Sequence, residues 1–313
     1  MLAVGPALEC DAMRHWLTFT LALLPALAHA EEAKIPREGF DLWYRRYGTG
    51  RPVLVLSGGP GIDCDYMEPV AQTLAKTNQA VLVELRGTGR SRPPVVNAET
   101  VSVKTCLTDL EALRDHLKVE RWTVVGHSAG GTLGLFYAAA HPASVEALVL
   151  ISSGHVVYEA ENAVTDNVFM RLCPREQQQV EELRKSTAGT PEERMAARMK
   201  LMLPGYFFDR DKAAGMVTAT KPESFHADTM MLLMRDMLHP GMDLRPALKD
   251  FARPTLAIAG RQDPLDPKVQ YEIHLALKDS TLELIPRCGH FPWIEQPERF
   301  YEAVDRLLAR AAR

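Results

Sequence analysis

The sequence predicts an α/β fold, in which a mostly parallel β-sheet is flanked by helices and carries an inserted helical cap. Its 313 residues are 46% apolar and have a formal net charge of -4, which suits one globular domain with an added lobe. Short apolar runs alternate with amphipathic stretches, as in a parallel sheet covered by helices on both faces. One long segment interrupts this alternation, and we interpret it as the cap.

The expected strands are short apolar runs bounded by turn-forming residues. They cover residues 53–56, 80–85, 122–125, 147–151, 255–259 and 281–285. Helices are expected over residues 106–117, 132–140 and 297–311, where apolar side chains recur at helical spacing. These elements place the core of the fold in residues 31–153 and 254–313.

Residues 154–253 lack strand-like runs and contain helical, charged sequence, which predicts the helical cap. This segment also holds ten of the chain's 13 methionines. Flexible methionine side chains can line an adaptable apolar pocket, and methionines at helical spacing can equally pack between helices, so both interpretations stay open. The ten are Met170, Met195, Met199, Met202, Met216, Met230, Met231, Met234, Met237 and Met242.

The first 30 residues have the layout of a secretory signal peptide. Arg14 precedes an apolar run over residues 16–28, which ends in the A-x-A sequence Ala28-His29-Ala30. The run is shorter than the roughly 20 residues that span a bilayer, and Pro25 interrupts it, so no stable membrane span is expected. We expect cleavage after Ala30 and a periplasmic or secreted protein. A true start at Met13, with residues 1–12 as an upstream extension, is compatible with this expectation. The alternative is an uncleaved apolar arm.

Composition also bears on partners and cofactors. Lys and Arg form no stripe that could follow a phosphate backbone, so no nucleic-acid partner is expected. No His, Cys or carboxylate cluster has metal-ligand spacing, so neither a metal nor another cofactor is expected. The cysteines beyond the leader can be free thiols or form up to two disulfides. They are Cys64, Cys106, Cys173 and Cys288. The oligomeric state stays open.

A candidate nucleophile lies in the sequence Gly126-His127-Ser128-Ala129-Gly130. This G-x-S-x-G motif follows an expected strand and precedes an expected helix, the context of a nucleophile elbow. The sharp turn would expose the Ser128 hydroxyl at the helix N-terminus, where the N–H of Ala129 can stabilise an oxyanion. Ser128 is therefore the expected nucleophile, against a mere tight turn as the alternative.

A serine nucleophile needs a base, and the base needs an acid that holds its tautomer. Asp263 follows the strand expected at 255–259, and His290 follows the last expected strand. Both would lie at carboxyl ends of parallel strands, where open α/β sheets bind ligands. Asp266 is the closest rival to Asp263. His127 adjoins the nucleophile, but its side chain should point away from the hydroxyl, so we expect a structural role for it.

The second half of an oxyanion hole is expected after the strand at 53–56, where the chain reads Ser57-Gly58-Gly59-Pro60-Gly61. Glycines let a backbone N–H approach the substrate, and Pro60 stiffens the loop. A phosphate-binding loop is the competing use of glycines, but no Gly-Lys-Ser follows. We assign the oxyanion role to the N–H of Gly59 together with Ala129.

Together these motifs, with Gly260-Arg261-Gln262-Asp263 and Gly289-His290, resemble the α/β-hydrolase superfamily over nearly the whole chain after the leader, the cap excepted. The Gly-Gly-Pro-Gly loop and the run Arg86-Gly87-Thr88-Gly89-Arg90-Ser91 are most similar to proline iminopeptidases (prolyl aminopeptidases). That family usually has His at the position of Ser57 and Gly-Gly-Ser-Trp-Gly at the elbow. Its cap carries acidic residues, often beside Trp, that hold the substrate's amino terminus, whereas residues 154–254 contain no Trp.

The expected function is hydrolysis of an ester or amide through an acyl-enzyme, on a small ester or a short peptide. A proline iminopeptidase-like activity and a carboxylesterase for small apolar acyl groups are both open. They differ in whether the cap presents a carboxylate to a substrate amine, and the candidates for it are Glu159, Glu161, Asp166 and Glu223. Epoxide and haloalkane hydrolysis are disfavoured because such relatives carry Asp in place of Ser128. A non-catalytic binding protein of this fold is the alternative from another class.

The leader generates the first prediction. Protein purified from its native host should begin at Glu31, because signal peptidase cleaves after an A-x-A sequence. Mass spectrometry of the intact protein measures this directly. A purified protein that still contains residues 16–30 would contradict it.

Overall fold

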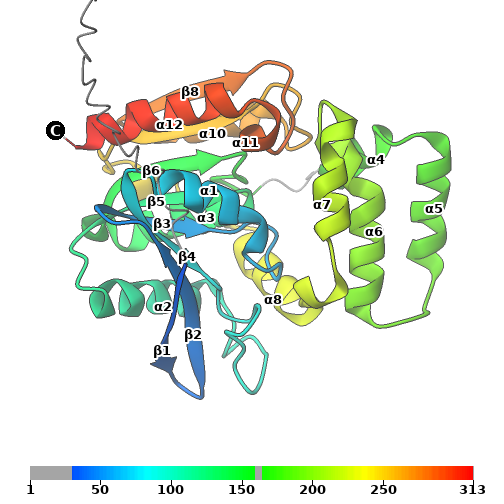
Figure 1. The fold of residues 1–313 in the computed structure, drawn as a ribbon, viewed down its shortest axis with the longest axis horizontal. Helices are drawn as coiled ribbons and strands as arrows, with labels where there is room; N and C mark the ends of the chain where they lie inside the picture. Colours follow the sequence, from blue (N-terminus) through cyan, green and yellow to red (C-terminus); the bar gives the residue numbers. More distant parts are fainter. Residues whose placement is uncertain (1–29, 159–163, 313) are drawn as a thin grey trace, which may run out of the picture.

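The computed structural model describes residues 30–158 and 164–312, and its centre is an eight-stranded sheet (Figure 1). The strand order is β1-β2-β4-β3-β5-β6-β7-β8. β1 pairs with β2 and β2 with β4 in antiparallel fashion, and all other neighbours are parallel, which confirms the expected mostly parallel sheet. The strands are β1 (Glu31–Arg37), β2 (Phe40–Tyr47), β3 (Arg51–Leu56), β4 (Asn78–Val83), β5 (Trp122–His127), β6 (Val145–Ile151), β7 (Thr255–Gly260) and β8 (Ser280–Ile285).

All six expected strands are present, with boundaries that differ by a few residues. The two strands that sequence reasoning missed, β1 and β2, form the antiparallel edge of the sheet. In β1 only Ile35 is buried, because an edge strand needs few apolar side chains. Pro36 lies within this strand, where its missing N–H is tolerated at an edge. The apolar runs that identified the other strands are therefore absent here.

Helices cover both faces of the sheet, because its strands are apolar on both sides. Val53 and Val55 of β3 pack in a cluster with α1 and α12, whereas Leu54 and Leu56 pack in the cluster that contains α2, α3 and α10. Alternate side chains thus fill two separate cores. These helices are α1 (Glu68–Leu74), α2 (Val103–His116), α3 (Ala129–Ala140), α10 (Pro267–Ala276), α11 (Pro292–Glu295) and α12 (Pro297–Ala311).

The segment between β6 and β7 is helical, and its first helices stand to one side of the sheet (Figure 1). Val168, Leu172, Val180 and Met202 form a small core of this lobe. α8 and α9, in contrast, pack into the core cluster of the sheet domain through Leu233, Met237 and Leu248. The helices are α4 (Val164–Met170), α5 (Pro174–Lys185), α6 (Pro191–Tyr206), α7 (Ala214–Ala219), α8 (Ala227–Met237) and α9 (Arg245–Leu248). The described ranges also contain four 3-10 turns, η1 (Asp65–Met67), η2 (Pro142–Ser144), η3 (Arg210–Ala213) and η4 (Pro222–Ser224).

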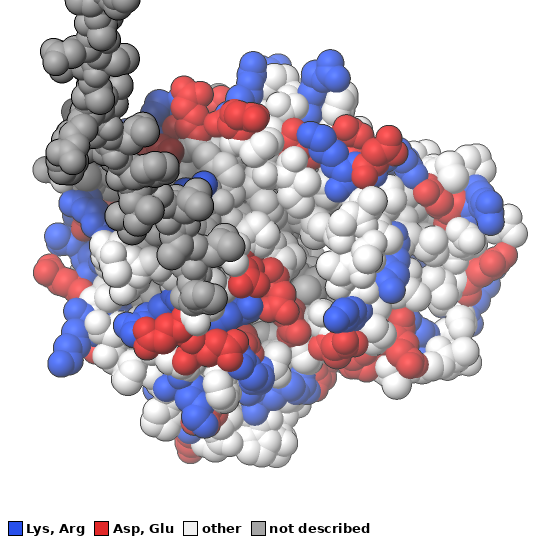
Figure 2. Space-filling view, viewed as in Figure 1, with Lys and Arg blue, Asp and Glu red and all other residues white. Residues whose placement is uncertain are grey.

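Several expectations concern single residues or the chain terminus. Cys64, Cys106 and Cys288 are buried free thiols and Cys173 is an exposed one, so the structure favours thiols over disulfides. The predicted leader lies outside the described residues, apart from Ala30. Within the described ranges, no helix has the length and apolarity needed to cross a membrane. On the face drawn in Figure 2, basic and acidic side chains are interspersed.

A buried ion pair ties the loop after β4 to α2. The guanidinium of Arg86 donates twice to Asp109, at 2.7 Å for both nitrogens. Arg37 of β1 donates to the same carboxylate at 2.6 Å. The Asp109 side chain is 2% exposed and that of Arg86 10% exposed, so neither charge is well hydrated. Each charge therefore depends on its partner.

Replacement of this acid provides the second prediction. Asp109→Ala leaves the Arg86 charge buried without its partner and should lower the free energy of unfolding by about 3–5 kcal/mol. Urea denaturation measures the loss. Asp41→Ala is the matched control, because it removes an exposed ion pair with Lys34 and should cost less than about 1 kcal/mol. Equal losses of unfolding free energy in Asp109→Ala and Asp41→Ala would contradict the dependence of the Arg86 charge on Asp109.

Candidate active site

Ser128 occupies a strained turn between β5 and α3. Its backbone has φ 53° and ψ -122°, a combination that residues other than glycine rarely adopt. The Ser128 N–H donates to the carbonyl of Ile151 at 2.8 Å, and its own carbonyl accepts the N–H of Gly131 at 2.9 Å. A Cβ on Gly130 would lie 2.4 Å from the carbonyl oxygen of Ser57, so only glycine fits there. This is the geometry of the expected nucleophile elbow.

Asp263 and His290 meet at the carboxyl ends of β7 and β8. The Nδ1 atom of His290 lies 3.0 Å from one Asp263 carboxylate oxygen and 3.1 Å from the other. Asp263 is 3% and His290 4% exposed. Burial alone would raise the pKa of Asp263, but the charge and hydrogen bond of His290 lower it overall, so the acid is ionised. The rival Asp266 instead caps α10 by accepting the Lys268 N–H at 2.9 Å.

Ser128 and His290 line the same cavity, which has a volume of about 640 Å³. The cap contributes most of the apolar lining. Two cap methionines reach the cavity, Met199 and Met216, while Met202, Met237 and Met242 are buried in cores and Met170 and Met231 are exposed. The aliphatic, methionine and phenylalanine side chains of the lining are those of Ile62, Val164, Met199, Leu203, Met216, Ala219, Phe225, Leu265 and Phe291. The cavity can therefore enclose an uncharged, apolar group beside Ser128.

Two backbone N–H groups are available as oxyanion donors. Gly59 has φ 63° and turns the loop after β3 along the cavity wall. Ala129 is the first residue of α3, whose N-terminal N–H groups have no partner inside the helix. The neighbouring N–H of Gly58 donates to the hydroxyl of Tyr66. Among the residues that the structure describes, no acceptor binds the N–H groups of Gly59 and Ala129.

Carboxylates reach the cavity from both the cap and the core. Of the four cap candidates, Glu223 in η4 lines the cavity, Asp166 does not, and Glu159 and Glu161 lie outside the described residues. Sequence reasoning missed Asp63 and Asp65 because it sought acids in the cap only. A signal was present in the run Asp63-Cys64-Asp65, directly after the glycine loop.

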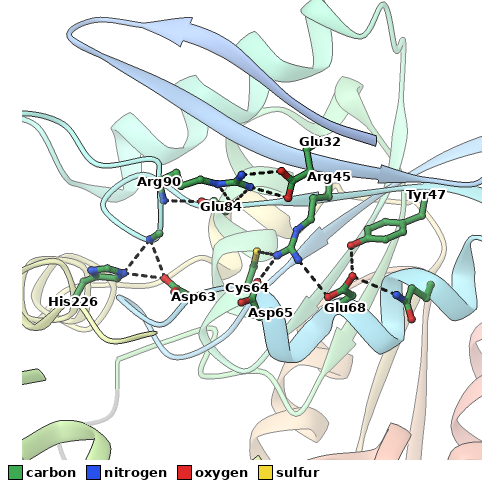
Figure 3. A network of polar contacts seen from close by, with 12 residues as sticks. Glu32, Arg45, Tyr47, Asp63, Cys64, Asp65, Glu68, Glu84, Arg90 and His226 are labelled. Atoms are coloured by element: carbon green, nitrogen blue, oxygen red, sulfur yellow. Dashed lines mark hydrogen bonds and ion pairs between the residues drawn. The ribbon is translucent and has the colours of Figure 1, made fainter. Parts of the chain in front are cut away.

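The two core carboxylates have partners of their own (Figure 3). Asp63 accepts the N–H of Gly89 at 2.9 Å and lies 2.9 Å from Nε2 of His226. Asp65 pairs with Arg45 at 2.5 Å. Glu223 is exposed and forms no ion pair with any described residue. Of the three, Glu223 is therefore the carboxylate most free to meet a cationic group of a substrate.

The His127 ring contacts the Tyr66 hydroxyl and the backbone carbonyl of His290, and the residue also lines the cavity. Its ring is 2% exposed and lies between Tyr66 and the His290 loop. Burial, reinforced by the charge of His290, lowers the pKa of His127 well below its usual value. The ring is therefore neutral. Elsewhere in the described ranges, no three His, Cys, Asp or Glu residues are grouped to hold a metal ion.

Comparison with known proteins places the chain in a family. The profile of the alpha/beta hydrolase fold matches residues 51–297. A proline iminopeptidase from Lactobacillus crispatus is 25% identical over 297 residues, which cover 88% of this chain and 97% of that protein.

Two solved structures share the fold. An alpha/beta fold family hydrolase from Bacillus anthracis superposes with a TM-score of 0.70 at 21% identity, covering 89% of this chain and 99% of the other. A proline iminopeptidase from Mycobacterium smegmatis gives 0.66 at 20% identity, covering 90% and 98%. Because the family match extends from the first residue of β3 past the end of β8, the chain belongs to the alpha/beta hydrolase fold family, in which this enzyme is similar to proline iminopeptidases.

Proposed function

We propose that the protein is a serine hydrolase, similar to proline iminopeptidases, that cleaves an ester or amide bond through an acyl-enzyme. One observation carries the proposal. Ser128, held in the strained turn, opens onto the same cavity as His290, which is paired with the buried Asp263. This set of a nucleophile, a base and an orienting acid is what serine hydrolysis requires.

Each residue then has one role in the reaction. The Ser128 oxygen attacks the substrate carbonyl carbon while Nε2 of His290 takes the hydroxyl proton, and Asp263 stabilises the imidazolium at Nδ1. The N–H groups of Gly59 and Ala129 hold the oxyanion. Collapse of the intermediate breaks the bond to the leaving alcohol or amine, which receives the proton from His290. Water, activated by the same histidine, hydrolyses the acyl-enzyme and restores Ser128.

The cavity lining favours an apolar acyl group beside Ser128. Such a group needs no charged partner, whereas an ammonium needs a carboxylate because burying an unpaired cation costs several kcal/mol. Glu223 is the acid best placed to pair with such an ammonium, as the iminopeptidase alternative requires. We therefore keep an esterase and an iminopeptidase-like activity as the two substrate classes.

We also propose how the chain is divided and where it acts. In this proposal the core of residues 31–153 and 254–313 supplies the triad and the oxyanion donors. Residues 154–253 serve as the cap over the cavity, to which Met199 and Met216 contribute. Export to the periplasm or the medium is proposed from the leader sequence alone.

Ser128→Ala tests the nucleophile. Turnover of every substrate should fall by ~10⁴-fold or more, because no other residue can form the acyl-enzyme. Circular dichroism should stay unchanged, since the side chain lies on a turn. A fluorophosphonate probe should label the wild-type protein and fail to label this variant. Ser186→Ala, at a half-buried serine that follows α5 and does not line the cavity, is the control and should keep full activity. Retained turnover in folded Ser128→Ala would overturn the assignment.

Substrate class is tested with two chromogenic series. We expect measurable hydrolysis of short-chain p-nitrophenyl esters, because the apolar lining accepts an uncharged acyl group. Glu223→Gln should leave ester kinetics unchanged, and if proline arylamide is a substrate, it should raise KM for that amide alone. An enzyme that cleaves proline arylamide efficiently and leaves the esters untouched would show that the esterase interpretation is wrong.

A further inference from the structure

The three segments of the proposed site meet at Tyr66 and His127. The N–H of Gly58, in the loop that carries Gly59, donates to the Tyr66 hydroxyl. That hydroxyl lies 2.9 Å from Nδ1 of His127, the residue directly before the nucleophile. Nε2 of His127 lies 3.0 Å from the backbone carbonyl oxygen of His290. One chain of hydrogen bonds therefore joins the oxyanion loop, the elbow and the base loop.

The direction of every proton in this chain is determined by its ends. The carbonyl of His290 can only accept, so Nε2 of His127 must carry the proton. Since the buried ring is neutral, Nδ1 is unprotonated and accepts the proton of the Tyr66 hydroxyl. Burial raises the pKa of Tyr66, so the phenol keeps that proton. The Tyr66 oxygen in turn accepts from Gly58, and only this arrangement satisfies all three bonds.

Side-chain packing on both sides holds this chain of hydrogen bonds in place. The His127 ring lies edge-on to Trp293 at 4.8 Å between centroids and 4.6 Å from the ring of His290. A Cβ on Gly58 would lie 2.4 Å from the His127 carbonyl oxygen and 2.7 Å from Cβ of Ser128. The Gly58 peptide is thus clamped between the elbow and the Tyr66 hydroxyl.

We propose that Tyr66 and His127 are positioning residues for hydrolysis, which fix the oxyanion loop and the base loop relative to Ser128. This role rests on the proposed function. With its N–H bound to Tyr66, Gly58 cannot turn its peptide, and the next N–H, that of Gly59, stays free for the oxyanion. At the other end, His127 restrains the backbone from which the His290 side chain projects.

Positioning by Tyr66 and His127 matters because the reaction rate is sensitive to small displacements of the oxyanion donors and of the base. Oxyanion donors act only when they lie about 2.7–3.1 Å from the developing charge, and a 1 Å misplacement can cost on the order of 100-fold in rate. An apolar pair of the same size would fill this space but leave the Gly58 N–H and the His290 carbonyl without these partners. The polar pair adds an orientation to both loops that apolar packing does not specify.

A double-mutant cycle tests the proposal with p-nitrophenyl butyrate as substrate. Tyr66→Phe removes the hydroxyl from both neighbours, and His127→Gln cannot reach both of its partners. Each variant should lower kcat by ~10–100-fold with KM changed less than about twofold, because positioning acts in the transition state. The double variant should lose little more than either single one, since both break the same chain.

A matched variant separates positioning from loss of stability. Tyr137→Phe removes another buried hydroxyl, which bonds Glu111 and the Trp122 indole outside the cavity. It should keep the wild-type kcat even if its melting temperature falls as far as that of Tyr66→Phe. An equal loss of kcat in this control would overturn the proposal.

The proton positions can be measured without turnover. Nitrogen-15 NMR of histidine-labelled protein should show a ring that stays neutral, with Nε2 protonated and Nδ1 bare, at every pH from 6 to 9, and His127→Gln should remove that signal. A charged ring or an Nδ1–H tautomer would overturn the proposal. An unchanged kcat in Tyr66→Phe, or an effect on KM alone, would also overturn the positioning role of Tyr66 and His127. Either result would leave the proposed serine hydrolase function intact. Full activity in Ser128→Ala would instead overturn both.

Discussion

The turn at Ser128 is the constraint on which the site depends. Its positive φ costs about 1–3 kcal/mol and persists because the surrounding bonds determine it. The Ser128 N–H is held by Ile151 at the end of β6, and its carbonyl receives two N–H groups from the first turn of α3. β5 is buried over its whole length, so neither end of the turn can relax. The stability of the sheet core therefore offsets the conformational cost of a serine at a position whose backbone angles glycine adopts without strain.

Two histidines lie with their rings 4.6 Å apart beside this turn, and their environments differ. Nδ1 of His290 lies 3.0 Å from a carboxylate oxygen of the buried, ionised Asp263. His127 is enclosed by aromatic rings and stays neutral. In the proposed mechanism, a charged His127 would oppose the imidazolium formed on His290, and the neutral ring avoids that repulsion. In that mechanism, the apolar surroundings of His127 thus favour proton transfer to His290.

Sequence reasoning found what local pattern determines and missed what the tertiary structure determines. Six of the eight strands, β3 to β8, were predictable as short apolar runs, α12 from its helical spacing, and the elbow at Ser128 from its G-x-S-x-G motif. Their pairing also brought Asp263 and His290 together as expected. β1 was not predictable from an apolar run because it buries only one residue, and in β2 the charged residues Asp41, Arg45 and Arg46 interrupt the apolar side chains. Tyr66 gave no signal, because its role arises only when η1 folds back under the glycine loop.

The helical segment between β6 and β7 forms hydrogen bonds with the loop that carries Gly59 and with the loop that carries His290. Ile62 forms a β-bridge with Phe225, and the N–H of His226 donates to Gly61 at 2.8 Å, so the cap pairs with the segment that follows Gly59. At the other loop, the carbonyl of Tyr206 accepts the N–H of His290 at 2.8 Å. The buried carboxylate of Glu295 accepts N–H groups from both Phe208 and Gly289. In the proposed mechanism, the backbone of residues 154–253 thus helps to position both the loop that carries Gly59 and the loop that carries His290.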